Sequence, residues 1–189
     1  EVRSGRADPV QNAGAALMSC VATLLQLLIV VAGVSMLWLK TILIPTLVAT
    51  AVLALCALFL LRKSEQQQII EHKDSRMFSL KEAGLIAVLL TVIQAMVYGL
   101  SMWLGDAGLI VGTLLASLFE IHAAMATVVM QGTPEHTMVF YAFILGMGIH
   151  AISKSINAFL TGGFKYACAF APFQILHMVI FMALLWFLQ

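Results

Sequence analysis

Charged residues are scarce in this sequence of 189 residues: ten Lys and Arg and nine Asp and Glu make up 10% of it, whereas hydrophobic residues make up 62%. Soluble domains carry about 25% charged residues, so the composition excludes a water-soluble enzyme. With a net charge of only +1, the chain also offers no basic surface for a nucleic acid. The composition instead predicts an integral membrane protein.

Cysteine and catalytic motifs are also sparse. The three cysteines, Cys20, Cys56 and Cys168, form no CxxC pair, which excludes a disulfide framework or a zinc knuckle. No HExxH, CxxCH, Gly-rich phosphate loop or Ser/His/Asp set is visible, so we expect no enzyme. The opening EVRSGRADP lacks both the pattern of a signal peptide and an initiator Met, which indicates a trimmed or partial chain.

Six apolar segments are long enough to cross a bilayer, whose core of about 30 Å needs about 20 helical residues. No alternating strand pattern competes with them. We therefore expect a single all-α membrane domain over 1–189, a polytopic transmembrane helical bundle of about six spans. The expected spans are about 9–38, 42–61, 80–104, 107–130, 134–161 and 166–188, with a cytoplasmic loop at 62–79. Three residues occupy helix-capping positions, namely Asp8, Ser79 and Asp106.

Basic residues set the expected orientation. They gather in the N-terminal segment and around the 62–79 loop, as Arg3, Arg6, Arg62, Lys63, Lys73, Arg76 and Lys81. The positive-inside rule places both regions on the cytoplasmic side of the inner membrane. An even number of spans then brings both termini to that side and leaves Lys40 and Lys165 outside.

Five ionisable residues lie inside the apolar segments, where charge is expensive and marks a functional site by default. They are Glu120, His122, His150, Lys154 and His177. At about 1.5 Å per residue, Glu120, His150 and His177 fall near the middle of their spans. His150 and Lys154 are four residues apart and share a helix face. We expect Glu120 to neutralise Lys154 across the helix interface, with His150 within reach.

The helix expected over 107–130 has two further features. On a regular helix His122 points about 200° away from Glu120, at about 100° per residue, so this helix is either enclosed by partners or locally irregular. Small residues at Gly112, Ala116 and Ala124 form a stripe that permits close helix packing. This stripe is one reason to expect a homodimer.

The segments GDAGLIVGTLLASLFEIHAAMATVV (105–129) and HAISKSINAFLTGG (150–163) resemble the uncharacterised polytopic membrane domain usually found C-terminal to an MgtC/SapB-type membrane domain. In that family a Gly-Asp-Ala-Gly turn opens a helix with an acid-x-His-Ala motif, and the next helix carries Asn-x-x-x-Lys-Thr/Ser before Gly-Gly. The matching residues are Asp106, Glu120, His122, Lys154 and Ser155. His150 stands where Asn is usual, and Gln26 where the first helix often has Arg.

The resemblance implies a bacterial membrane protein linked to magnesium homeostasis, ion transport or acid survival, with an N-terminal MgtC/SapB-like domain as a partner outside this chain. Our first hypothesis is a proton- or cation-linked transporter or channel-like protein for a small ion. Its site would comprise Glu120, His122, His150, Lys154 and Ser155. The alternative is a regulatory or scaffold membrane protein without transport.

A third hypothesis is an intramembrane metal or haem site. His122, His150 and His177 lie at similar depth, and Glu120 could complete a ligand set. Each histidine lies on a different expected helix, so their spacing gives no support, and we expect no cofactor. The partners expected for the chain are the lipid bilayer and a second copy, and no nucleic acid.

Overall fold

The computed structural model of the protein describes residues 9–63 and 80–188, and these residues form helices without any strand. The helices are α1 (Pro9–Val34), α2 (Met36–Lys63), α3 (Leu80–Phe119), α4 (Ile121–Gln131) and α5 (Thr137–Leu188). Four of them are long and apolar enough to cross a membrane. The expected all-α helical membrane bundle is confirmed. The capping positions Asp8 and Ser79 lie outside the described residues.

A single serine separates α1 from α2. The amide of Ser35 still donates to the carbonyl of Val31 at 2.8 Å, while its Oγ accepts from the amide of Trp38 at 3.4 Å. Ser35 therefore ends one helix and caps the next. The turn thus comes several residues earlier than the expected boundary between 38 and 42, and Pro45 lies inside α2.

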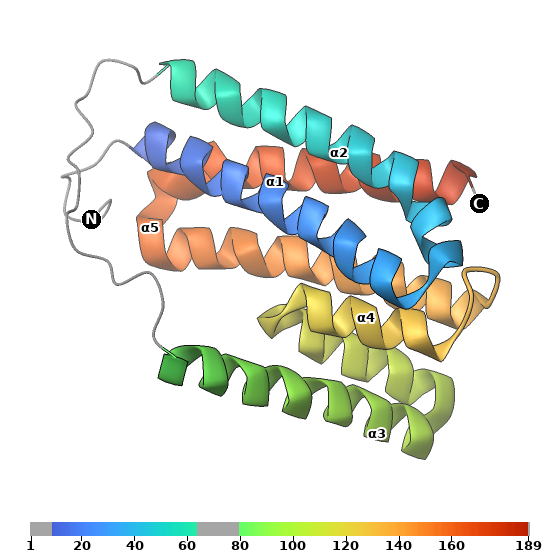
Figure 1. Ribbon diagram of the computed structural model, residues 1–189. Helices are drawn as coiled ribbons and strands as arrows, with labels where there is room; N and C mark the ends of the chain where they lie inside the picture. Colours follow the sequence, from blue (N-terminus) through green and yellow to red (C-terminus); the bar gives the residue numbers. More distant parts are fainter. Residues whose placement is uncertain (1–8, 64–79, 189) are drawn as a thin grey trace.

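α3 and α5 each fold back on themselves at a glycine. Gly105 has φ 58° and Gly163 has φ 78°, a left-handed region that glycine adopts without strain. Each helix is thereby divided into two segments that run in opposite directions, 80–104 and 106–119 in α3, and 137–162 and 164–188 in α5 (Figure 1). Both reversals lie where the sequence predicts the spans to be separated.

The helix expected over 107–130 is interrupted at Glu120, whose backbone is extended (φ −149°, ψ 119°). The chain reverses here, so that 106–119 and α4 lie side by side and run in opposite directions (Figure 1). We call residues 106–131 the hairpin and Glu120 its tip. At about 1.5 Å per residue its two arms are roughly 16 to 21 Å long, shorter than a bilayer core of about 30 Å. The hairpin therefore enters the bundle without crossing it.

Two glycines admit the hairpin into the bundle. A Cβ on Gly112 would lie 3.2 Å from the Cα of Val97 in the 80–104 segment. A Cβ on Gly146 of α5 would lie 2.9 Å from the Oγ of Ser117 and 2.6 Å from the Cε of Met125. Ala116 is fully buried. The small residues of the 106–119 arm therefore pack inside the chain instead of facing a second copy.

Because the hairpin does not cross, Pro9 and Leu188 lie at opposite ends of the bundle (Figure 1). This placement differs from the expectation that both termini share one side. Lys165 follows the reversal at Gly163 and lies at the same end as Lys63 (Figure 1), which we call the Lys63 end. The opposite end is the Leu188 end.

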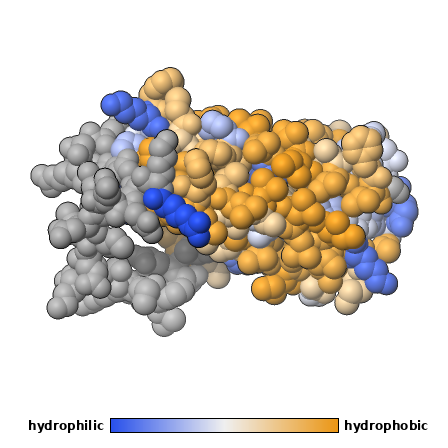
Figure 2. Space-filling model, turned by 90° about the horizontal axis from the view of Figure 1, so that it is seen from above, coloured by the Kyte–Doolittle hydropathy of each residue, from blue (hydrophilic) through white to orange (hydrophobic). Residues whose placement is uncertain are grey.

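The outer surface is apolar between these two ends. On the face seen in Figure 2, mostly hydrophobic residues cover the middle of the bundle, and the most hydrophilic residues lie toward its ends. Inside, the fully buried Trp38 stacks on Phe143 with ring centroids 4.9 Å apart. Its Nε1–H donates to the carbonyl of Gly132 at 2.7 Å. This bond attaches the base of the hairpin to the start of α2.

Candidate functional site

The tip of the hairpin lies against the middle of α1 and of the 137–162 segment of α5. The carbonyl of Ser117 accepts a hydrogen bond from Nδ1 of His150 at 3.0 Å, and the carbonyl of Leu118 accepts one from Oγ of Ser153 at 3.2 Å. The last carbonyls of a helix have no partner within it, and in a membrane they must find one in the protein. Side chains near the centre of the 137–162 segment supply these partners.

Glu120 accepts hydrogen bonds from the free amides at the start of α4, next to the carbonyls at the end of α3. Its Oε1 accepts from the amide of His122 at 3.0 Å, and its Oε2 accepts from the amide of Ala123 at 2.5 Å. A carboxylate at this position also compensates the positive end of the α4 dipole. The acid that the sequence singles out for chemistry is thus also the N-cap of a half-length helix.

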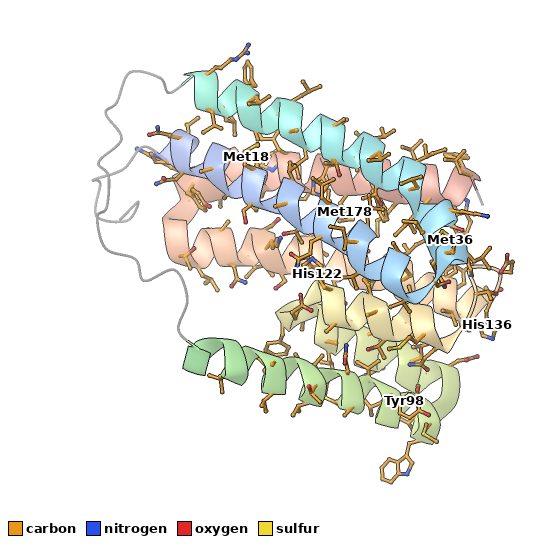
Figure 3. The ribbon with its side chains drawn as sticks, in the orientation of Figure 1. Met18, Met36, Tyr98, His122, His136 and Met178 are labelled. Atoms are coloured by element: carbon orange, nitrogen blue, oxygen red, sulfur yellow. The ribbon has the colours of Figure 1, made fainter. Side chains whose placement is uncertain are left out.

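His122 joins the tip to α1. Its Nδ1 lies 2.6 Å from Oε1 of Glu120, and its Nε2 lies 3.1 Å from the backbone carbonyl oxygen of Thr23. Figure 3 shows His122 at the start of α4, facing α1. With side-chain exposures of 17% for His122 and 25% for Glu120, the pair is mostly enclosed.

These two contacts fix the number of protons on the pair. A carbonyl oxygen only accepts, so Nε2 of His122 carries a hydrogen. A second proton must lie between Nδ1 and Oε1, because two lone pairs 2.6 Å apart would repel each other. The pair is therefore either a carboxylate with an imidazolium or a carboxylic acid with a neutral imidazole. In both forms it is neutral overall and holds one exchangeable proton.

Lys154 lies next to this pair without joining it. Its Nζ donates to Oγ1 of Thr23 at 3.4 Å and to Sγ of Cys20 at 3.6 Å. The expected ion pair between Lys154 and Glu120 is absent from the part of the chain that the structure describes, where Glu120 pairs with His122. The reason is geometric, because the helix break turns both Glu120 oxygens toward the start of α4.

A central cavity of about 10 Å³ lies beside Lys154, between α1 and both segments of α5. His150 and His177 line it together with Lys154, so the structure brings together three of the predicted residues here. Ser155 does not join them, because its hydroxyl donates back to the carbonyl of Ala151 at 2.9 Å. Asp106 is exposed just after the reversal at Gly105, and its capping role stays a prediction.

Sequence reasoning assigned no role to three polar residues that complete the site. Thr23 contacts both His122 and Lys154, Ser153 contacts the tip, and Gln174 lines the central cavity. Gln174 alone carried a recognisable signal, since it is an amide within an otherwise apolar segment. Threonine and serine in a membrane helix usually bond to their own backbone, so their sequence positions give no indication of a site.

The histidines do not gather into a metal centre. Within 9–63 and 80–188, no group of three or more His, Cys, Asp and Glu side chains is placed to hold a metal ion. Both ring nitrogens of His122 are already engaged with protein oxygens. The described residues therefore give the metal hypothesis no geometric support, and the expectation of no cofactor stays a prediction.

Comparison with known proteins adds one match. Residues 2–162 match the family described as Domain of unknown function (DUF4010). The match includes the hairpin, His150 and Lys154, whereas Gln174 and His177 lie beyond it. No curated protein and no solved structure matches the sequence. Because the match spans most of the chain, the protein belongs to the DUF4010 family of domains of unknown function.

Proposed function

We propose that this protein transports a small ion across the membrane in a cycle linked to proton exchange at Glu120 and His122. The observation that supports it is the helix break at Glu120, which brings two half-helix ends and the Glu120–His122 pair to the middle of the bundle. Irregular backbone at membrane depth is tolerated where it is buried in protein or lines a water-filled cavity. Discontinuous helices of this kind form the ion and substrate sites of many secondary transporters.

Proton exchange at the pair would act on the position of the hairpin. If the shared proton leaves, the carboxylate faces the lone pair of Nδ1 across 2.6 Å, and attraction becomes repulsion. The contact between the tip and α1 runs through the same imidazole, whose Nε2 bonds to Thr23. Loss of the proton therefore favours release of the tip from α1, which is the type of coupling that a proton-linked transporter needs.

Lys154 supplies the second part of the site. Its only side-chain partners among the described residues are a hydroxyl and a thiol, neither of which offsets a positive charge. A charge in this position is costly in a membrane and is retained where it serves a function. We assign Lys154 the role of adjusting the charge of the site as ion and proton exchange. This role requires neither an enzymatic reaction nor a cofactor.

The orientation follows from the distribution of basic residues. Arg62 and Lys63 end α2, and Lys165 lies at the same end of the bundle. Lys40 lies at the Leu188 end, where it lines a surface pocket together with Leu188. By the positive-inside rule we place the Lys63 end in the cytoplasm and Leu188 on the far side of the inner membrane. We also propose two protein partners. They are a bacterial MgtC/SapB-like domain, which the sequence resemblance implies, and a second copy of this chain.

The test is a flux measurement with purified protein in liposomes that contain a pH-sensitive dye. Gradients of Na⁺, K⁺, Mg²⁺ and Cl⁻ are imposed in turn, and the change in internal pH is recorded. We expect one gradient to drive proton movement with the wild type, and Glu120→Gln to reduce its rate at least about tenfold, equivalent to about 1.4 kcal/mol in the barrier.

The matched control is Glu135→Gln in the 132–136 turn. Glu135 is fully exposed, and a hydrogen bond from Thr133 holds its pKa below the usual range, so the same chemical change takes place far from the tip. This variant should transport like the wild type. Absence of flux under every gradient would overturn the proposal and favour the regulatory or scaffold function.

A further inference from the structure

Two residues that line the central cavity each have a buried polar atom without a partner in the part of the chain that the structure describes. The two atoms are Nε2 of His150 and Oε1 of Gln174. Gln174 is only 2% exposed, so lipid and bulk water do not reach it. Both residues line the cavity together with Lys154, Thr23 and Cys20. Buried polar atoms are nearly always paired, so unpaired atoms on two residues that line one cavity point to a ligand in it.

The hydrogen-bonding roles of the lining atoms can be assigned. Nδ1 of His150 lies 3.0 Å from the carbonyl of Ser117, and because a carbonyl only accepts, Nδ1 carries the hydrogen. In the neutral ring Nε2 is then an acceptor. Oε1 of Gln174 is also an acceptor, and Lys154 is a donor whose present contacts, at 3.4 and 3.6 Å, are long. The cavity thus presents two acceptors and one strong donor.

One small molecule matches this pattern in both size and polarity. A cavity of about 10 Å³ corresponds to roughly one water-sized probe. A water molecule donates two hydrogen bonds, to His150 and Gln174, and accepts one from Lys154. A metal cation would meet the ammonium of Lys154, and an anion would meet two lone pairs.

We propose that the central cavity binds one water molecule through His150, Gln174 and Lys154, and that this water relays protons between Lys154 and His150. In a transfer step an N–H bond of Lys154 breaks as an O–H bond of the water forms, and the water's other O–H bond breaks as an N–H bond forms at Nε2 of His150. The water stays neutral and the positive charge moves to the imidazole. Only the use of this relay in transport rests on the proposed function.

Solid-state NMR on the full chain in lipid bilayers tests the binding of this water. With ¹⁵N-labelled histidine, and with the His150 signals assigned from a His150→Gln variant, magnetisation transfer from water to Nε2 of His150 is measured. We expect the Nδ1–H tautomer and clear transfer in the wild type. We expect the transfer to be lost in Gln174→Met, which keeps the length of the side chain but removes the acceptor.

The matched control is Gln26→Met, the same change at an exposed position of α1, which should leave the transfer intact. If Gln174→Met does not fold, Met178→Phe fills the cavity from another wall and should abolish the transfer in the same way. An Nε2–H tautomer, or transfer that persists in the filled cavity, would overturn the proposal. Flux is measured separately, so bound water without transport contradicts only the proposed function.

Discussion

Nδ1 of His122 and Oε1 of Glu120 lie 2.6 Å apart although only one residue separates them in the chain. A regular helix would direct their side chains to nearly opposite faces. The contact is possible because Glu120 has left the helical conformation and caps the next helix. The helix break therefore creates the contact between Glu120 and His122.

We expect Glu120 to be energetically coupled to His122 and not to Lys154. A double-mutant cycle with Glu120→Gln and His122→Gln should give a coupling energy above about 1 kcal/mol, because the two share a hydrogen bond. The cycle with Glu120→Gln and Lys154→Met should give less than about 0.5 kcal/mol, because no bond joins them. The free energy of unfolding in mixed micelles provides both values. A large Lys154 coupling would contradict the observed pairing.

Lys154→Met should separate stability from transport. Among the described residues, Lys154 has only a hydroxyl and a thiol as side-chain partners, so replacing this half-buried amine by the apolar Met removes a desolvation cost that no opposite charge offsets. We expect an unchanged or higher unfolding midpoint, together with loss of flux. Thermal unfolding in detergent and the liposome assay measure the two effects. A markedly lower midpoint would instead make Lys154 a structural residue.

Gly146→Val should weaken the docking of the hairpin. The new side chain would meet Ser117 and Met125, which lie 2.9 and 2.6 Å from the position of a Cβ. Overpacking of this kind reduces the free energy of unfolding by about 1–3 kcal/mol. The control is Gly99→Val, since nothing lies within 4 Å of a Cβ on Gly99. Equal losses in the two variants would show that only helix propensity has changed.

Trp38→Phe should loosen the base of the hairpin while preserving the aromatic stack on Phe143. The variant loses the Nε1–H bond to the half-buried carbonyl of Gly132, and loss of one such hydrogen bond reduces the free energy of unfolding by about 1 kcal/mol. Faster hydrogen exchange of amides in the 132–136 turn should accompany the loss. Trp103→Phe is the matched control, since Trp103 is 89% exposed, and it should leave both quantities unchanged.

Much of the helical layout follows from the sequence because apolar length and helix punctuation are local properties. Gly105 and Gly163 mark the reversals of α3 and α5. Both reversals can be located from the sequence, because each glycine lies between two apolar segments of spanning length. The break at Glu120 was foreseen only as one of two options, because Phe119-Glu120-Ile121 contains no glycine or proline. The break depends on tertiary partners, which are the bonds from His150 and Ser153 to the preceding carbonyls.

In the candidate site, too, the residue types could be predicted from the sequence, whereas their contacts could not. Burying an ionisable group carries a large cost whatever its neighbours, so Glu120, His122, His150 and Lys154 could be selected from the sequence alone. Their pairing could not, because it depends on side-chain directions that the break at Glu120 changes. Thr23 could not be predicted for another reason. It binds His122 through its backbone carbonyl, a group that every residue has.

The hairpin is joined to the rest of the chain only at the Leu188 end, through Gly105 on one side and the 132–136 turn on the other (Figure 1). Its tip is held without a covalent link, by hydrogen bonds and by the packing of buried residues such as Ile121. In the transport cycle that we propose, withdrawal of the hairpin would therefore uncover the central residues toward the Leu188 end only. Access from the Lys63 end would require a separate movement of the long helices α1, α2 and α5.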